Sequence, residues 1–422
     1  MNQPDRAPDA PGVPARRAAL RLLDAVLRRG ETVDQASGRA LAAVRADSDR
    51  ALALAIVGEA LRHLVDIDAL IDTATQRLLP PDAKARFALR IALVQALVLG
   101  TPPHAAIATV LPLVDGGPRK LVHGVFGTLM RRRAGLPAAV ALPPPVAARW
   151  QAAWGEAMAA AAARLLATPP PLDLTLKTDA GDMPDGVALM PGHCRLPRGA
   201  AIPALPGFEQ GDWWVQDIAA SLPARLLGRG PGRAIDACAA PGGKTMQLAA
   251  AGWRVIALDV AESRLARLRD NLRRTHLSAE IVTADATRWS PDEPVDAVLV
   301  DAPCSATGIY RRHPDVLHRV HPAMIAESAE LQRHLLAHAA GWVRRGGRLV
   351  YAACSLEREE GEDQVTAFLA ANRDFAIEPA TADELPAGIA QTDRGWLRLL
   401  PGMLEEQGGC DGFFIARLAR AD

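Results

Sequence analysis

Apolar residues recur every three to four positions through the first third of the chain. In residues 15–30, ARRAALRLLDAVLRRG, Leu22, Leu23 and Val26 fall on one helical face, and a glycine ends the pattern. Residues 85–100, ARFALRIALVQALVLG, are nearly all apolar, which is typical of a central helix buried on most sides. Because no part of this region alternates with period two, the pattern predicts an all-α bundle of five or six helices.

The periodicity changes after the helical region. Two proline clusters in residues 137–171 flank one predicted helix, and residues 171–220 contain short β-like pieces. From Arg233 onward, apolar strand patterns alternate with amphipathic helices, which is typical of a parallel, doubly wound α/β sheet. Two last β-like segments, residues 375–379 and 411–418, are expected to form antiparallel edge strands.

These changes divide the chain into five expected segments. They are a disordered lead-in at 1–15, a helical bundle at 16–140, a linker with one connecting helix at 141–170, a small α+β segment at 171–225 and an α/β domain at 226–422. A multidomain protein is also what the length of 422 residues predicts.

Composition and charge exclude several classes of protein. The chain has no net charge, but residues 1–150 hold 20 Lys and Arg against 13 Asp and Glu, which suits a polyanionic partner. The five cysteines are far apart and form no CxxC pair, which argues against a disulfide framework or a thiolate zinc site, and no metal is expected. No apolar stretch approaches the roughly 20 residues of a membrane span, and the N-terminus lacks an apolar signal core. We therefore expect a cytoplasmic protein with reduced thiols and no membrane partner.

A loop rich in small residues, DACAAPGGKTMQLA at residues 236–249, follows an apolar strand and opens a helix. Small residues let a ligand approach the backbone, and the N–H groups at a helix N-terminus can bind a negatively charged group. The spacing matches neither the dinucleotide-binding fingerprint nor the P-loop. On its own, the segment could also be an ordinary strand-to-helix turn.

Aspartates occur at the ends of four successive predicted strands. They are Asp236, Asp259, Asp285 and Asp301. A single such aspartate is more often a helix cap, but isolated buried carboxylates are costly, so packing does not explain four of them. The carboxyl ends of strands border the ligand crevice of an open α/β sheet, where a carboxylate can accept hydrogen bonds from a ribose diol. The set favours a nucleoside-containing cofactor.

Two of the cysteines follow predicted strands at the same edge of the sheet. Cys304 lies three residues after Asp301, and Cys354 ends the next strand. Either thiol alone is more readily explained as inert core, but two of them beside an Asp-Ala-Pro turn favour chemistry. A thiolate that adds to C6 of a pyrimidine makes C5 nucleophilic enough to accept a methyl group. That reaction also needs a carboxyl group at the N3/N4 edge and a second group that helps release the base, and Asp301 and Cys304 match these needs.

Four segments together resemble the motifs of a known enzyme family. DACAAPGGKT, LVDAPCSATG, YAACSLEREEGEDQV and DGFFIARL are similar to motifs I, IV and VI and the last strand of the S-adenosyl-L-methionine-dependent RNA cytosine-C5 methyltransferases. The helical bundle resembles the NusB-like RNA-binding domain. Together they resemble the RsmB (Sun/Fmu) family, which methylates a cytosine of 16S rRNA. The resemblance implies a Rossmann-like class I methyltransferase domain at 226–422 and an RNA-contacting role for the small α+β segment.

The resemblance also implies roles for individual residues. Cys354 would be the nucleophile and Cys304 would assist release of the methylated base, and this second cysteine points to RNA rather than DNA. Asp259 would bind the ribose of S-adenosyl-L-methionine, Asp285 its adenine side, and Asp301 both the cofactor and the base. The loop that would hold the methionine part of the cofactor consists of Cys238, Ala239, Ala240, Pro241, Gly242, Gly243 and Lys244, the last of which would act with Asp301.

The implied partner is 16S rRNA, bound by a monomer. Methylation of tRNA or 23S rRNA is an alternative, which the NusB-like bundle disfavours. A non-catalytic RNA-binding assembly factor on the same scaffold is a further alternative, which the presence of both cysteines and all the aspartates disfavours.

Four other features can have ordinary structural explanations. Residues 131–135, RRRAG, are either an RNA-binding patch or charge that complements a helix C-terminus. Residues 310–315, YRRHPD, either touch RNA phosphate or form a solvated loop. Trp213 and Trp214 are expected to pack within the small segment. The acids from Glu357 to Asp363 are expected to stabilise a helix N-terminus, and their charge would oppose thiolate formation at Cys354.

Overall fold

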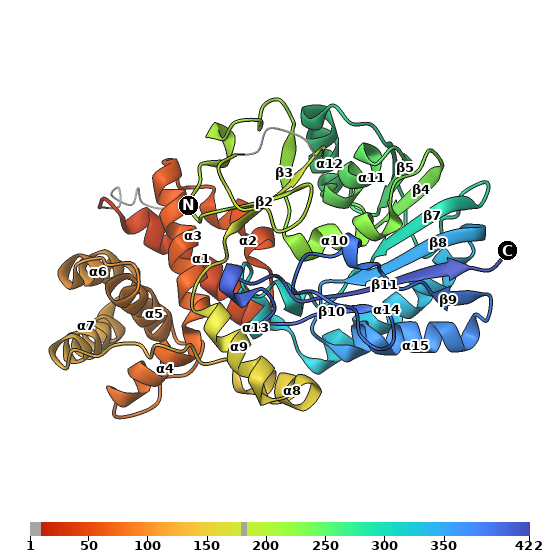
Figure 1. Ribbon diagram of the computed structural model, residues 1–422. Helices are drawn as coiled ribbons and strands as arrows, with labels where there is room; N and C mark the ends of the chain where they lie inside the picture. Colours follow the sequence, from red (N-terminus) through yellow and green to blue (C-terminus); the bar gives the residue numbers. More distant parts are fainter. Residues whose placement is uncertain (1–9, 179–183) are drawn as a thin grey trace, which may run out of the picture. The chain divides into compact units, whose positions relative to one another are not determined.

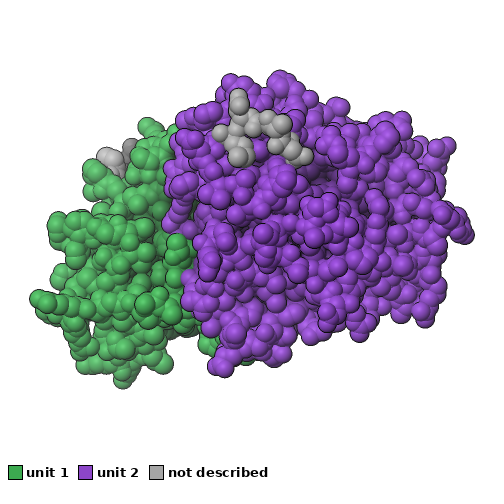
Figure 2. All heavy atoms as spheres, in the orientation of Figure 1, with its two compact units in different colours: residues 1–149, 166–168, 313–319 green, residues 150–165, 169–312, 320–422 purple. Residues whose placement is uncertain are grey.

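A computed structural model describes residues 10–178 and 184–422. These residues form two compact units (Figure 2). The helical unit comprises residues 1–149, 166–168 and 313–319, and the sheet unit comprises residues 150–165, 169–312 and 320–422. An all-α bundle followed by α/β structure is the fold class that the periodicity predicts. Residues 1–9 of the predicted lead-in lie outside the described residues.

The described part of residues 10–149 contains seven complete α-helices and one short 3-10 helix (Figure 1). They are α1 (Val13–Arg29), α2 (Val33–Leu41), α3 (Asp47–Arg62), α4 (Leu64–Thr73), α5 (Lys84–Leu97), α6 (Pro103–Val110), η1 (Leu111–Leu113) and α7 (Gly116–Arg131). The sequence predicted five or six, because its apolar pattern continues through His63, where the structure separates α3 from α4. Helix α1 also begins inside the predicted lead-in, with Pro14 in its first turn, a position that suits proline.

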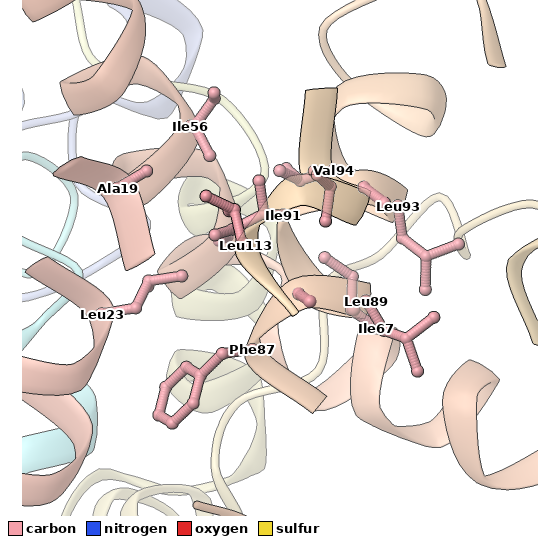
Figure 3. Close-up of a cluster of buried hydrophobic side chains, with 14 of the residues drawn as sticks. Ala19, Leu23, Ile56, Ile67, Phe87, Leu89, Ile91, Leu93, Val94 and Leu113 are labelled. Carbon is pink, nitrogen blue, oxygen red and sulfur yellow. The ribbon is translucent and has the colours of Figure 1, made fainter. Parts of the chain in front are cut away.

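Helix α5 is central to the helical core, as its composition predicts. Every residue from Ala85 to Gln95 is buried. Figure 3 shows Leu89 and Ile91 of α5 among apolar side chains from α1, α3, α4 and η1. The buried guanidinium of Arg90 pairs with Asp68 of α4 at 2.7 Å, so the charge within this apolar helix is neutralised.

A short segment from the second half of the chain belongs to the helical unit. Residues 313–319, which include α13 (Val316–Arg319), pack against α1. His318 Nε2 lies 2.7 Å from the carbonyl oxygen of Leu61, so it carries the proton that it donates. Burial lowers the pKa of His318, which keeps the ring neutral at pH 7.

Two helices occupy the region in which one connecting helix was expected. They are α8 (Pro144–Trp154) and α9 (Glu156–Leu166). Gly155 separates them with a φ of 86°, a left-handed conformation that glycine adopts without strain. The many alanines on both sides of this glycine conceal the break in the hydrophobic pattern.

The small β segment of the sheet unit is a three-stranded antiparallel sheet in the order β2-β1-β3. Its strands are β1 (Leu172–Leu176), β2 (His193–Leu196) and β3 (Trp213–Val215). Trp213 and Trp214 are both buried, so the expectation that they pack is confirmed. Arg195 and Asp173 form a bidentate ion pair between β2 and β1, with distances of 2.6 and 2.7 Å.

The large sheet has the strand order β10-β11-β8-β7-β4-β5-β6, with β9 beside β11. Its strands are β4 (Arg233–Ala237), β5 (Arg254–Asp259), β6 (Glu280–Thr283), β7 (Val295–Asp301), β8 (Val343–Ala353), β9 (Phe375–Ile377), β10 (Leu397–Leu399) and β11 (Phe413–Arg420). Strands β4 to β8 are parallel and β11 is antiparallel to its neighbours. The chain runs outward from β4 through β5 to β6 and then returns to the other side of β4. This reversal is a topological switch point, where ligands bind in such sheets.

Helices cover both faces of the large sheet. Figure 1 shows α10 (Ile218–Leu227), α11 (Gly243–Ala250) and α12 (Glu262–Thr275) on one face, and α14 (Pro322–Ala340) and α15 (Glu362–Ala371) on the other. The prediction that β11 is an edge strand is wrong, because it pairs with β8 on one side and with β10 and β9 on the other. In residues 10–178 and 184–422, no helix is both long and apolar enough to cross a membrane.

Candidate active site at the switch point

The loop rich in small residues lies between β4 and α11, at the switch point. Gly242 has a φ of 107°, and a Cβ at this position would lie 3.0 Å from Leu268, so both conformation and space favour glycine. Cys238 also has a positive φ, of 64°. Burial raises the pKa of its thiol to about 12, so this third cysteine stays protonated and is a packing residue of the loop.

Asp236 lies within β4, just before the loop, and hydrogen-bonds to Thr245, which follows the loop. It is fully buried, and Thr245 Oγ1 donates a hydrogen bond of 2.6 Å to one carboxylate oxygen, while the other has no partner among the described residues. Burial raises its pKa to about 7. Of the four aspartates predicted to reach the sheet edge, this one is therefore enclosed in the protein instead.

Asp259 ends β5 beside the loop. Its carboxylate is buried and accepts hydrogen bonds from the backbone N–H of Ala240 at 3.1 Å and of Ala261 at 2.9 Å. The next residue, Val260, is 69% exposed, which is unusual for a branched apolar side chain at a strand end. A buried carboxylate and an exposed aliphatic surface are thus adjacent at this edge, and the sequence pattern did not single out Val260.

Asp285 follows β6 and is separate from this cluster. Its side chain is 48% exposed, and Oδ1 accepts hydrogen bonds from the N–H and the hydroxyl of Thr287, at 2.9 and 2.7 Å. These hydrogen bonds lower the pKa of the carboxyl group. Among the residues that the structure describes, the ion-pair partner of its Oδ2 is Arg288, at 3.8 Å, beyond hydrogen-bond distance, so one oxygen can accept a hydrogen bond from a ligand.

Lys244 and Asp301 form an ion pair between the start of α11 and the end of β7. Lys244 Nζ lies 2.7 Å from Asp301 Oδ2 and 5.4 Å from the centre of the Phe413 ring. Burial alone would lower the pKa of Lys244, but the charge and hydrogen bond of Asp301 raise it above its ordinary value. The lysine is therefore a fixed cation that orients the carboxylate.

Cys304 and Cys354 come together at the ends of β7 and β8. Their sulfur atoms lie 3.4 Å apart, and both residues are partly exposed. The N–H of Gly308 donates to the carbonyl oxygen of Cys354 at 3.0 Å, which joins the two loops. The hydrogen bond with Cys354, together with burial, raises the pKa of Cys304. Cys304 is thus a thiol that is held in its protonated form.

Two cations interact electrostatically with Cys354. One is Lys244, and the other is Arg312, whose pKa is raised by the charges of Asp411, Asp217 and more weakly Cys354, despite burial that lowers it. Arg312 pairs with Asp411 and lies 3.3 Å from Asp217. Its neighbour Arg311 is buried and donates to the carbonyl oxygen of Gly408. Arg311 is held inside the sheet unit, so neither predicted explanation fits it. The Arg312 side chain pairs with two aspartates but is 32% exposed, so for Arg312 the two explanations stay predictions.

The acids after Cys354 do more than begin a helix. Glu362 and Asp363 do stand in the first turn of α15, as predicted, but three of the acids are buried in separate interactions. Glu357 accepts a hydrogen bond from Trp150, and Glu362 forms an ion pair with Arg398. Glu360 binds residues of both cysteine loops. The sequence shows only a run of charge here, because burial of each acid depends on a partner far along the chain.

Family models match two regions of the chain. Residues 228–419 match the family described as 16S rRNA methyltransferase RsmB/F, and residues 13–127 match the NusB family. A protein from Xylella fastidiosa (strain Temecula1) named ribosomal RNA small subunit methyltransferase B is 36% identical, with 97% of this chain and 98% of that protein covered. A protein of the same name from Xanthomonas campestris pv. campestris is 34% identical, with 98% of each covered.

A solved structure supports the fold over the whole chain. The crystal structure of PH0851 has a TM-score of 0.74, at 22% sequence identity, and covers 98% of this chain and 100% of its own. At this identity the likeness shows a shared fold. The relatives at 34–36% identity, which are matched over nearly their full length, extend the assignment from the fold to the family. The chain therefore belongs to the RsmB/F family of S-adenosyl-L-methionine-dependent rRNA methyltransferases, a family of RNA cytosine-C5 methyltransferases.

Proposed function

We propose that this enzyme methylates C5 of an unpaired cytosine in 16S rRNA through a covalent bond between Cys354 and C6 of the base. The observation that carries the proposal is the pair of thiols 3.4 Å apart, next to the Lys244–Asp301 ion pair. A single thiol would serve attack alone, whereas attack and release are separate steps that two thiols can share.

The residues at the switch point fit the cofactor. The Asp259 carboxylate suits the two ribose hydroxyls, and the exposed surface of Val260 suits one face of the adenine ring. Backbone N–H groups at the start of α11 suit the carboxylate of the methionine part. Asp285 offers its open oxygen to the adenine edge, and Asp301 offers a negative charge beside the positive sulfonium.

S-adenosyl-L-methionine, when bound, supplies an electrophilic methyl group. Cys354 acts as the nucleophile: its sulfur bonds to C6, and the C5–C6 π electrons become available at C5. The negative charge that this addition places on the ring is offset by the ammonium of Lys244. Asp301, held by Lys244, would accept a hydrogen bond from the N4 amino group at the N3/N4 edge. Because the base must admit a sulfur to C6, it is unpaired or flipped out of its helix.

Cys304 acts in the release of the product. Once C5 carries the methyl group, the bond from Cys354 to C6 breaks and the departing sulfur takes the proton of the Cys304 thiol. The resulting Cys304 thiolate accepts the C5 proton, and the electrons of the C5–H bond restore the C5–C6 double bond. The sulfur of Cys304 contacts that of Cys354, so it is near both atoms that change. Its raised pKa suits a group that exchanges a proton with the departing sulfur instead of competing for C6.

Helix α7 of the NusB-like region offers a surface for the RNA backbone. Arg119, Lys120 and Arg131 are all exposed on it. Among the described residues, none of these three forms an ion pair with an acid, whereas Arg28 and Arg29 of α1 pair with Asp24. Unpaired cations on one helix are the groups that phosphates neutralise, so we place the RNA backbone here.

Mapping of 5-methylcytidine in rRNA and tRNA from cells with and without the gene tests the proposed target. We expect one modified cytosine of 16S rRNA to lose its methyl group in the deletion strain and to regain it on complementation. Loss of a methyl group from tRNA or 23S rRNA instead would support the alternative substrates. Unchanged methylation of all three RNAs, with altered ribosome assembly, would favour the non-catalytic alternative.

A further inference from the structure

Glu360 lies at the centre of a buried hydrogen-bond network between the two cysteine loops. It ends the short helix η4 (Arg358–Glu360) and is fully buried. Its Oε1 accepts hydrogen bonds from the N–H of Ser305 at 2.8 Å and from Gln332 at 3.2 Å. Its Oε2 accepts hydrogen bonds from the hydroxyl groups of Ser305 and Ser355. An ionised carboxylate has about four acceptor sites, so these four donors satisfy it.

The partners of Glu360 adjoin both thiols in the chain. Ser305 directly follows Cys304, and Ser355 directly follows Cys354. Gln332 of α14 also donates to the carbonyl oxygen of Pro303, at 2.8 Å, on the other side of Cys304. One side chain thus binds the residue after each sulfur, through the N–H and hydroxyl of Ser305 and through the hydroxyl of Ser355.

We propose that Glu360 is a positioning residue, whose carboxylate holds the loops of Cys304 and Cys354 at the separation at which one sulfur attacks the base and the other releases it. The inference rests on the proposed function, because it gives each sulfur a separate step. Glu360 has no hydrogen bond to either sulfur among the described residues, so it acts through Ser305, Ser355 and Gln332 and through its charge.

The negative charge of Glu360 supports the same division of roles. The hydrogen bond with Cys354 and burial raise the pKa of Cys304 most, and the charge of Glu360 raises it further. Burial raises the pKa of Glu360 itself, while hydrogen bonds from Ser305 and Ser355 act against this change. A glutamine has the same shape, but its amide nitrogen cannot accept a hydrogen bond, so at least one of the present donors loses its partner.

The test compares Glu360→Gln with Glu359→Gln, an exposed glutamate in the same short helix. An unmodified 16S rRNA fragment serves as substrate, and the readouts are kcat, the Kd for S-adenosyl-L-methionine, the pH–rate profile and the fraction of enzyme bound covalently to RNA at steady state. For E360Q we expect an unchanged Kd, a kcat about 10- to 100-fold lower because misplaced groups react slowly, and more covalent adduct. We also expect the limb of the profile that reports Cys304 to move to lower pH, while E359Q behaves like the wild type.

The proposal is overturned if folded E360Q keeps the kcat and adduct fraction of the wild type, or if its activity falls only in proportion to its unfolded fraction. If E360Q does not fold, Ser305→Ala and Ser355→Ala each remove one hydroxyl group from the network. Normal kcat and adduct levels in both serine variants also overturn it. Failure of the proposed function looks different, because Cys354→Ala would then retain methyl transfer whatever E360Q does.

Discussion

The sulfur atom of Cys304 lies 3.4 Å from that of Cys354, although 50 residues separate them in the chain. The contact exists because β7 and β8 are neighbours in the parallel sheet, with Asp301 paired to Ala352. The loops that follow the two strands therefore begin side by side. A distance of this size allows a thiol–thiol hydrogen bond without a covalent link. One sulfur of the pair can therefore carry a proton while the other acts as the nucleophile.

Substitution of each cysteine should stop the reaction at a different step. Cys354→Ala should abolish both methyl transfer and the covalent RNA adduct, because no sulfur remains to attack C6. Cys304→Ala should form the adduct and fail to resolve it, so that a protein–RNA species resistant to denaturing electrophoresis accumulates. The double variant should form none. Cys194→Ala, at a buried cysteine of the three-stranded sheet, is the control and should retain activity.

Two results would refute this division of roles. One is full activity in Cys354→Ala. The other is an adduct in Cys354→Ala and none in Cys304→Ala, which would make Cys304 the attacking residue.

The Lys244–Asp301 ion pair should act as one unit. Asp301→Asn and Lys244→Met should each lower the single-turnover rate by about 100-fold or more, since each removes charge placed at the reacting base. The double variant should be little slower than the slower single variant, because each substitution already breaks the 2.7 Å contact. Lys177→Met, at a lysine that donates to the carbonyl oxygen of Thr275, is the matched control. Rate losses that simply multiply would contradict the coupling.

Affinity for the cofactor should depend more on Asp259 than on Asp285. Asp259 is buried with both oxygens oriented by backbone N–H groups, so Asp259→Asn should raise the Kd for S-adenosyl-L-methionine by about 10- to 100-fold, the effect of one charged hydrogen bond. Asp285→Asn should raise it less, because that side chain is exposed and held in a local turn. Isothermal titration calorimetry measures both, with the exposed Asp292→Asn as control. An unchanged Kd in Asp259→Asn would exclude the ribose contact.

The partly buried His318 should make the helical unit less stable in acid. Burial lowers its folded-state pKa below the ordinary 6.5, so below that pH the unfolded chain binds an additional proton. Its contribution to stability is therefore fully present above about pH 6.5 and declines as the pH falls, by up to about 1.4 kcal/mol per pH unit. Hydrogen exchange of α3 and α5, corrected for intrinsic rates, should show a smaller pH dependence in His318→Gln than in the wild type. His334→Gln, at a side chain 69% exposed, should keep the wild-type dependence, and an equal slope in His318→Gln would argue against this origin.

The unpaired cations of α7 should control the salt dependence of RNA binding. The double variant Arg119→Glu/Lys120→Glu should bind a 16S rRNA fragment more weakly, and the slope of log K against log salt should become shallower by about 0.7 to 0.9 per lost contact. Arg28→Glu/Arg29→Glu is matched in charge but alters arginines already paired with Asp24, so it should have the smaller effect. Equal slopes for the wild type and the α7 variant would show that the RNA backbone does not bind to these two residues of α7.

Local patterns in the chain were enough to predict the main architecture and the candidate thiols. Period 3.6 before residue 137 and alternating strands and helices after Arg233 distinguish an α-bundle from a doubly wound sheet. Parallel strands place their carboxyl ends at one edge, and for that reason Cys304 and Cys354 could be expected near each other before their distance was known.

The features that escaped prediction depend on partners distant in the chain. Burial of Glu360 requires Ser305 and Gln332, and Arg312 is occupied by Asp217 and Asp411. Such pairings leave no periodic signal, so the sequence presents them as ordinary surface charge. The interior position of β11 was not predicted for a similar reason. The local sequence of a strand does not show which strands pair with it, and β11 pairs with β8 on one side and β10 on the other.

The seven residues 313–319 have a consequence for synthesis of the protein. Because they belong to the helical unit, with His318 bonded to the carbonyl oxygen of Leu61, the N-terminal bundle lacks part of its fold when only residues 1–149 have left the ribosome. Its completion must wait until residue 319 emerges, when β4 to β7 have already been translated. A fragment that ends near residue 150 would therefore lack the His318–Leu61 hydrogen bond and the packing of α13 against α1.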